Sequence, residues 1–163
     1  LLFRSSRVVV LRSLTKFYGL PGLRVGYAVT APKVAQKLRS ALPPWSVNAM
    51  GQTAALAALQ DTSHASRSFR FMVKERLRFG GLLAAMPGCT VFPAHANFLF
   101  MELPLGWHAG RITQQLRRKG LLIRDCSTVP GASKRLIRIA VRLGRDNDRL
   151  IAALSRLLSE SAT

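Results

Sequence analysis

The sequence is poor in acidic residues, in cysteine and in long apolar runs. It contains 7 Asp and Glu against 25 Lys and Arg, a formal net charge of +18 at pH 7. Cys89 and Cys126 are far apart and match no disulfide or metal pattern, which favours free thiols in a reducing compartment, the cytoplasm. His64, His95 and His108 share no ligand spacing, so we expect no metal. No apolar run approaches the roughly 20 residues that cross a bilayer, so we expect no membrane partner.

The excess of positive charge raises nucleic-acid binding as one class of function. The excess is mostly arginine, and it is scattered along amphipathic segments rather than gathered in a basic run. Aromatic residues make up 7% of the chain and do not interleave with the basic residues as a base-stacking platform would. We therefore expect no specific nucleic-acid partner, and a basic nucleic-acid-binding module stays open as a third hypothesis.

The size and composition indicate a folded chain. With 163 residues, 48% of them hydrophobic, the chain can form one domain or slightly more around a sizeable core. It begins with Leu1 rather than methionine, and a strand pattern follows almost at once. We expect that it was cut from a longer protein.

The order of the patterns predicts an α/β fold. Val8–Leu11 is typical of a buried strand in a parallel sheet, and a second apolar strand starts at Val25. The remaining predicted elements are helices over 32–42, 53–59 and 63–86, strands over 90–92 and 97–103, a helix over 107–119, strands over 121–124 and 136–141, and a helix over 146–158. Ser46 or Asn48 is expected to cap the second helix.

The long helix over 63–86 is predicted to connect two parts of the chain. Its expected apolar stripe consists of Phe69, Val73, Leu77 and Leu83. The part before it contains alternating strands and helices, and the part after it reads as a small α+β domain.

One stretch between the first two strands combines residues suited to a phosphorylated aldehyde. Ser13 is followed three positions later by Lys16, and Arg24 lies eight positions after that lysine. A lysine amine condenses with an aldehyde to form a Schiff base, the usual anchor of pyridoxal 5′-phosphate. Hydroxyls from Ser13 and Thr15 and the fork of Arg24 suit a phosphate. A surface loop that happens to hold a lysine is the alternative for an isolated S-x-x-K pattern.

The whole string Ser13–Tyr27, SLTKFYGLPGLRVGY, resembles the lysine motif of fold-type I pyridoxal-phosphate enzymes, the class I/II aminotransferase superfamily. The resemblance implies that Lys16 is the Schiff-base lysine, that Ser13 and Arg24 hold the cofactor phosphate and that Thr15 adds a hydroxyl. It runs from Val8 to Leu154. It also implies the end of a large domain with a mixed, mostly parallel sheet over 1–60, a connecting helix over 61–86 and a small carboxyl-terminal α+β domain over 87–163.

Three polar residues of the last segment are candidate substrate residues. Arg124 follows an apolar run, and Arg138 interrupts the apolar strand Leu136–Val141. On alternation alone either arginine can face solvent, because an unpaired buried charge is costly. The resemblance implies that Arg138 binds the substrate α-carboxylate and Arg124 a substrate phosphate or carboxylate. Asn97 matches the family's A-N-F signature and is a third candidate, with a turn-forming role as the alternative.

Two branches of the superfamily compete for this chain. The segment Pro43–Leu59, PPWSVNAMGQTAALAAL, looks more like the threonine-phosphate decarboxylases of cobalamin biosynthesis than the histidinol-phosphate aminotransferases. That resemblance implies a small phosphorylated amino-acid substrate and a homodimer with Trp45–Asn48 at the interface. The aminotransferase remains the alternative. The family's amino-terminal half has no counterpart in these residues, so we expect the isolated chain to be inactive.

Overall fold

The computed structural model describes residues 7–160 and divides the chain into two compact units between Ser68 and Phe69. The opening residues Leu1–Phe3, and with them the start of the predicted segment 1–60, lie outside the described residues. Within the described part, no helix is both long and apolar enough to cross a bilayer.

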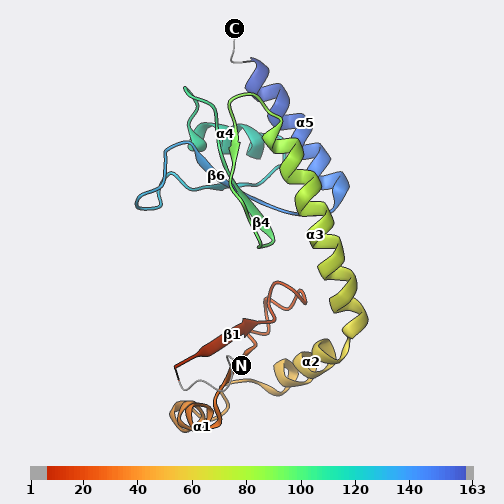
Figure 1. The fold of residues 1–163 in the computed structure, drawn as a ribbon, viewed down its shortest axis with the longest axis vertical. Coiled ribbons are helices and arrows are strands. Elements are labelled where there is room, and N and C mark those ends of the chain that lie inside the picture. The colour runs from red at the N-terminus through yellow and green to blue at the C-terminus, as the bar shows by residue number, and fades with distance from the viewer. Residues whose placement is uncertain (1–6, 161–163) are drawn as a thin grey trace. The chain divides into compact units, whose positions relative to one another are not determined.

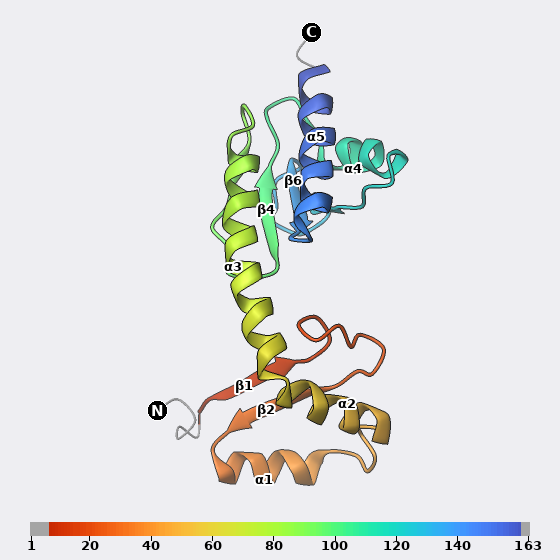
Figure 2. The same ribbon diagram turned by 90° about the vertical axis from the view of Figure 1, so that its right-hand side faces the viewer.

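The first unit is built on a pair of strands. Strand β1 (Val9–Ser13) and strand β2 (Gly26–Thr30) are antiparallel, and their register pairs Val9 with Thr30 and Ser13 with Gly26. Helix α1 (Pro32–Ala41) follows β2 directly and contacts it, as can be followed in Figure 2. Helix α2 (Ala49–Gln60) completes the unit together with the start of α3.

The prediction of a buried strand in a parallel sheet at Val8–Leu11 is wrong for the pairing that the structure describes. β1 pairs antiparallel with β2, and the side chains of Val9 and Leu11 are 44% and 77% exposed. The connection over 14–25 consists of turns and contains no helix, whereas parallel neighbours are usually joined by a helical crossover. The apolar run therefore predicted a strand correctly. It did not predict the antiparallel direction of the partner strand or the exposure of the strand within this chain.

Helix α1 begins at the predicted residue, whereas α2 begins at Ala49, four residues before the predicted range, directly after the expected cap Asn48. Pro32 occupies the first turn of α1, where its missing N–H leaves no intrahelical bond unmade. Asn48 caps α2, because its side-chain oxygen accepts from the backbone N–H of Gly51 at 2.7 Å. Of the two expected caps, Asn48 is the one that the structure uses.

Helix α3 (Thr62–Ala84) leads into the second unit, which contains a four-stranded antiparallel sheet. Its strands are β3 (Thr90–Val91), β4 (Phe98–Glu102), β5 (Arg124–Asp125) and β6 (Leu136–Ala140), in the order β3-β4-β6-β5. Helix α4 (Ala109–Arg118) joins β4 to β5, and helix α5 (Gly144–Glu160) follows β6.

Only one face of this sheet belongs to the hydrophobic core. Leu99 and Met101 of β4 and Ile137 and Ile139 of β6 are buried, and they pack with residues of α3, α4 and α5. Figure 1 shows α3 and α5 running along the sheet. The core residues contributed by the helices include Phe79, Leu83, Ile112, Leu116 and Leu154. Residues that alternate with the core positions, such as Arg138, face the other way.

Two sequence predictions in this unit are corrected. In the stripe predicted for α3, Phe69 and Leu77 are exposed, whereas Phe79 is fully buried. The true buried face includes Glu75, a charged residue that interrupts the apolar pattern.

The strand predicted over 121–124 begins only at Arg124, because Leu121 belongs to the end of α4. Leu121 N–H donates to the Leu116 carbonyl at 3.0 Å, and Gly120 adopts φ +72°. This is the Schellman arrangement of a helix end.

Glu75 is buried in a polar network that joins α3 to the start of α5. Its carboxylate accepts two bonds from Arg78, at 2.6 and 2.9 Å, and one from Asn147 Nδ2 at 2.8 Å. Asn147 is 2% exposed and also donates to the Arg142 carbonyl at 2.9 Å. Hydrogen bonding from Arg78 lowers the pKa of Glu75 from its ordinary value of 4.5, and this outweighs the opposing effect of burial.

Replacing Glu75 with glutamine should lower the free energy of unfolding of this unit by about 1–2 kcal/mol at pH 7, since the charged hydrogen bonds to a half-exposed Arg78 are lost. Because the folded-state pKa of Glu75 is lowered, its contribution is present above pH 4.5 and is lost as the pH falls through the folded-state pKa. The two proteins should therefore converge in stability in acid.

The measurement is urea unfolding followed by the fluorescence of Trp107, in a Trp45→Phe background so that the first unit does not report. The matched control is Asp148→Asn, which removes a more exposed partner of the same Arg78 and should cost less. A Glu75→Gln variant as stable as wild type at pH 7 would contradict the assignment.

Candidate functional site

The predicted cofactor residues Ser13, Thr15 and Lys16 lie where β1 ends. Leu14 N–H donates to the Val25 carbonyl at 3.2 Å, and Leu14 and Val25 are buried. Side chains on either side of a buried strand residue point away from it, so Ser13 and Thr15 share one side. Their hydroxyls are 2.8 Å apart. Lys16 follows them in the turn and is exposed.

Arg24 lies at the same end of the strand pair, two residues before Gly26, the partner of Ser13. Its φ of 50° is in the left-handed region, which costs a non-glycine residue about 1–3 kcal/mol. Its Nη1 donates to the Pro21 carbonyl at 3.3 Å, and among the described residues it forms no ion pair with a carboxylate. Two hydroxyls and a guanidinium without a carboxylate partner thus belong to residues at one end of the hairpin, a donor set that fits a phosphate.

Backbone atoms approach one another closely at Gly26. A Cβ on Gly26 would lie 2.6 Å from the carbonyl oxygen of Arg12, a distance that real Cβ atoms do not reach. A Cβ on Gly51 would lie 3.4 Å from the carbonyl oxygen of Leu23. Gly26 therefore allows the strand pairing that holds Ser13, whereas a side chain at Gly51 would make only ordinary contact with Leu23.

His64 is a site-supporting residue that the sequence analysis missed. Its Nε2 lies 3.4 Å from the carbonyl oxygen of Phe17, the residue after Lys16, although the two residues are 47 positions apart. The His64 ring also lies 6.1 Å from the ring of Phe17 and 5.7 Å from that of Tyr18. The spacing of the histidines gave no sign of this contact, since it depends on the fold that returns the start of α3 to the loop.

The predicted substrate residues Arg124 and Arg138 lie on adjacent strands of the second unit. The register of β5 and β6 pairs them directly, and both are exposed. Arg135, by contrast, pairs with Glu102 at 3.1 Å. Neither Arg124 nor Arg138 forms an ion pair within the described part of the chain. Like charges at opposed positions of a sheet repel, so an anion bound between them would be stabilising.

Asn97, the third predicted substrate residue, lies just before β4. Its carbonyl oxygen accepts from the N–H of Val141 at 2.9 Å, which extends the β4–β6 pairing by one residue. Its side chain is exposed and forms no hydrogen bond to any other described residue. The structure thus brings Arg124 and Arg138 to paired positions but leaves Asn97 outside that pair, and its role stays a prediction.

The cysteines are free thiols, and residues 7–160 contain no cluster of metal-ligating side chains. No three His, Cys, Asp or Glu residues of this part gather as metal ligands. Cys89 and Cys126 are both free thiols. Burial raises the pKa of the Cys89 thiol, which favours its unreactive protonated form.

The sequence model of the aminotransferase class I and II family matches residues 2–157. The chain belongs to this family. It is 38% identical over 151 residues to the threonine-phosphate decarboxylase of Salmonella typhimurium, covering 92% of this chain and 41% of that protein. It is 36% identical to the histidinol-phosphate aminotransferase of Anaeromyxobacter sp., covering 93% and 40%. The chain thus spans about two fifths of the length of these curated relatives.

Solved structures support the predicted fold class. The histidinol-phosphate aminotransferase of Clostridium acetobutylicum superposes with a TM-score of 0.88 at 29% identity, covering 95% of this chain and 47% of that one. The L-threonine-O-3-phosphate decarboxylase of Porphyromonas gingivalis gives 0.85 at 27% identity, with 97% and 49% covered. The family depends on pyridoxal 5′-phosphate. The histidinol-phosphate aminotransferase of Sinorhizobium meliloti was solved in complex with it. That structure superposes with a TM-score of 0.79 at 28% identity, covering 98% of this chain and 43% of that one.

Replacing Gly26 with alanine should disrupt the end of the strand pair that holds Ser13, because the new methyl group would overlap the Arg12 carbonyl oxygen. We expect faster hydrogen exchange at the Leu14 amide, by at least tenfold. The matched control is Gly22→Ala in the same loop, where a Cβ would meet nothing within 4 Å. Equal exchange rates in the two variants would show that the close approach at Gly26 does not hold the loop.

Proposed function

We propose that this chain forms part of a pyridoxal-phosphate enzyme in which Lys16 binds the cofactor aldehyde. The observation that carries the proposal is the set of hydroxyl, lysine and arginine side chains at one end of the β1–β2 pair. Ser13, Thr15 and Arg24 would hold the cofactor phosphate, because they combine neutral donors with a fixed cation. When bound, the cofactor withdraws electrons from the bonds at the substrate α-carbon.

The two paired arginines would bind the substrate. In this proposal Arg138 binds the α-carboxylate and Arg124 the second anion, a phosphate. Two anionic groups on one small molecule would relieve the repulsion between the opposed guanidinium groups. Contacts at two points also fix how the substrate is turned, and this orientation decides which bond at its α-carbon is weakened. Asn97 remains a candidate for a further contact.

Among substrates that fit, we propose L-threonine O-3-phosphate, with decarboxylation to aminopropanol phosphate for cobalamin biosynthesis. The string at Pro43–Leu59 and the similarity to the Salmonella decarboxylase favour it. A histidinol-phosphate-type aminotransferase is the second candidate, and the similarity to the Anaeromyxobacter protein supports it nearly as well. Both substrates carry a phosphate, so both suit Arg124.

We also infer that the active protein is a homodimer. Trp45, in the segment expected at the interface, is 93% exposed and has a left-handed φ of 63°. An exposed tryptophan in a fixed, unfavourable backbone conformation is suited to contact with a second subunit.

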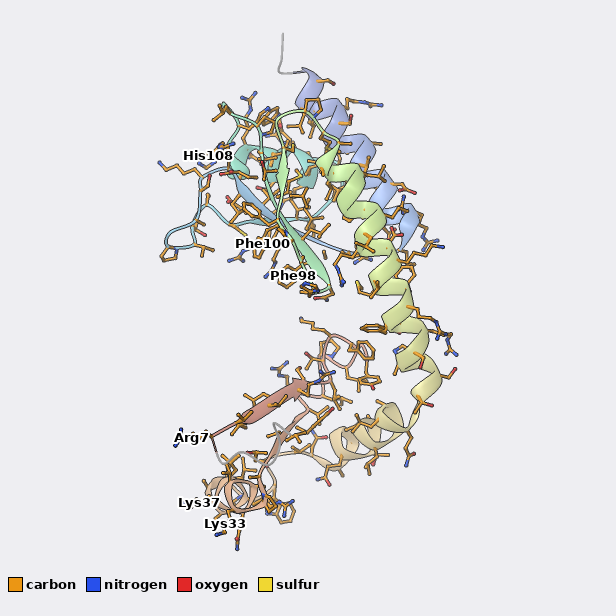
Figure 3. All side chains as sticks on the ribbon, in the orientation of Figure 1. Arg7, Lys33, Lys37, Phe98, Phe100 and His108 are labelled. Carbon is orange, nitrogen blue, oxygen red and sulfur yellow. The ribbon has the colours of Figure 1, made fainter. Side chains whose placement is uncertain are left out.

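Reduction with borohydride in the presence of pyridoxal 5′-phosphate should label Lys16 selectively. Peptide mass mapping measures the label at each lysine, and circular dichroism checks that the chain is folded. Lys33 and Lys37, which project from α1 as Figure 3 shows, serve as internal controls. We expect Ser13→Ala and Arg24→Gln to reduce labelling of Lys16 several-fold without affecting the controls. Even labelling of all lysines in a folded chain would contradict a formed cofactor site.

The reaction is tested on a protein that contains this chain together with the rest of the family's length. Release of carbon dioxide from L-threonine O-3-phosphate is expected, and amino transfer to a keto acid is the result that favours the second candidate. Arg124→Gln should raise KM for the phosphorylated substrate by about 10- to 100-fold, the effect of losing one charged contact. An unchanged KM would contradict the assignment of the phosphate to Arg124.

A further inference from the structure

The guanidinium group of Arg138 lies over an aromatic ring on the face of the β3-β4-β6-β5 sheet that lies away from the hydrophobic core. Its Cζ is 5.1 Å from the ring centre of Phe98. Figure 3 marks Phe98 and its neighbour Phe100 on β4. Strand register alone would not place Arg138 there, because its direct partner across the strands is Phe100, and Phe98 is opposite Ala140.

The residues around Phe98 explain why the arginine leans toward it. Ala140 has only a methyl group, so the space opposite Phe98 can receive the side chain of Arg138, two residues earlier on β6. Phe100 contacts Phe98 edge to face, with ring centres 5.4 Å apart and an interplanar angle of 79°. Phe98 is itself half-buried. Its ring is therefore a supported surface rather than a free side chain.

This contact favours one position of the cation. An exposed arginine has several rotatable bonds, and the like charge at Arg124 repels it from the adjacent strand. Attraction between a guanidinium and the face of an aromatic ring opposes both effects. The N–H donors lie in the plane of the guanidinium, so a cation whose flat face is on the ring keeps donors free at its edge for a carboxylate.

We propose that Phe98 is a positioning residue that holds Arg138 ready for the substrate carboxylate. The inference rests on the proposed function for the identity of the ligand, whereas the contact itself can be tested without any ligand. Phe98 does not touch the reacting atoms; it acts through Arg138 by limiting the orientations of the guanidinium.

The first test observes the contact in the free chain. In protein labelled with ¹⁵N-arginine, the Hε of Arg138, assigned through Arg138→Lys, should show a ring-current shift. Phe98→Leu should abolish that shift, Phe98→Tyr should restore it, and the matched control Phe100→Leu should retain most of it. A shift that is unchanged in Phe98→Leu, or lost equally in Phe100→Leu, would overturn the proposal.

The second test asks whether the positioning affects binding. The probe is L-threonine O-3-phosphate, with its Kd measured by calorimetry on the same variants. Phe98→Leu should weaken binding about two- to fivefold, the effect of one exposed cation–aromatic contact, and Phe98→Tyr should bind as wild type does. Equal affinities for wild type and Phe98→Leu would overturn the proposal. If the wild-type chain shows the ring-current shift but binds no L-threonine O-3-phosphate, the result contradicts the proposed substrate and not the contact of Phe98 with Arg138.

Discussion

The alternation of side chains along β4 and β6 is the constraint on which the second unit depends. Leu99, Met101, Ile137 and Ile139 occupy one face and are buried by α3, α4 and α5. The intervening positions, Arg138 among them, are thereby forced onto the opposite face. A slip of one residue in the register would expose the core residues and bury the arginine without a partner, so the free energy of the core also fixes the direction of the cation.

The first unit depends on a close approach of backbones rather than on a large core. Gly26 lets β2 come so near to Arg12 that no side chain fits between them, and the buried Leu14 and Val25 extend the pairing into the loop. Because Leu14 and Val25 point into the unit, the side chains of the neighbouring polar residues Ser13, Thr15 and Arg24 point away from it. A hairpin with few buried residues can in this way hold several polar side chains at one end.

Local sequence signals predicted much of the fold and failed where distant residues decide the outcome. Pro32 and the cap at Asn48 are local features, and the helices they begin were found correctly. The buried face of α3 was misread because Glu75 lies on it, where its carboxylate is satisfied by the nearby Arg78 together with Asn147, 72 positions away. The direction of the partner of β1 was misread for a similar reason, since an apolar run reports a strand but not its neighbour.

In the candidate site, too, local features could be predicted from the sequence and contacts between distant residues could not. The lysine motif could be found from spacing, because Ser13, Lys16 and Arg24 are close in the sequence. The direct pairing of Arg124 with Arg138 depends on register, and the contact of Arg138 with Phe98 runs diagonally across the strands rather than to its direct partner. In the proposed enzyme the two arginines hold the two ends of one substrate. A change in the direction of Arg138 would therefore turn the substrate about its phosphate, so the residues that orient this guanidinium would take part in the choice of the bond that breaks.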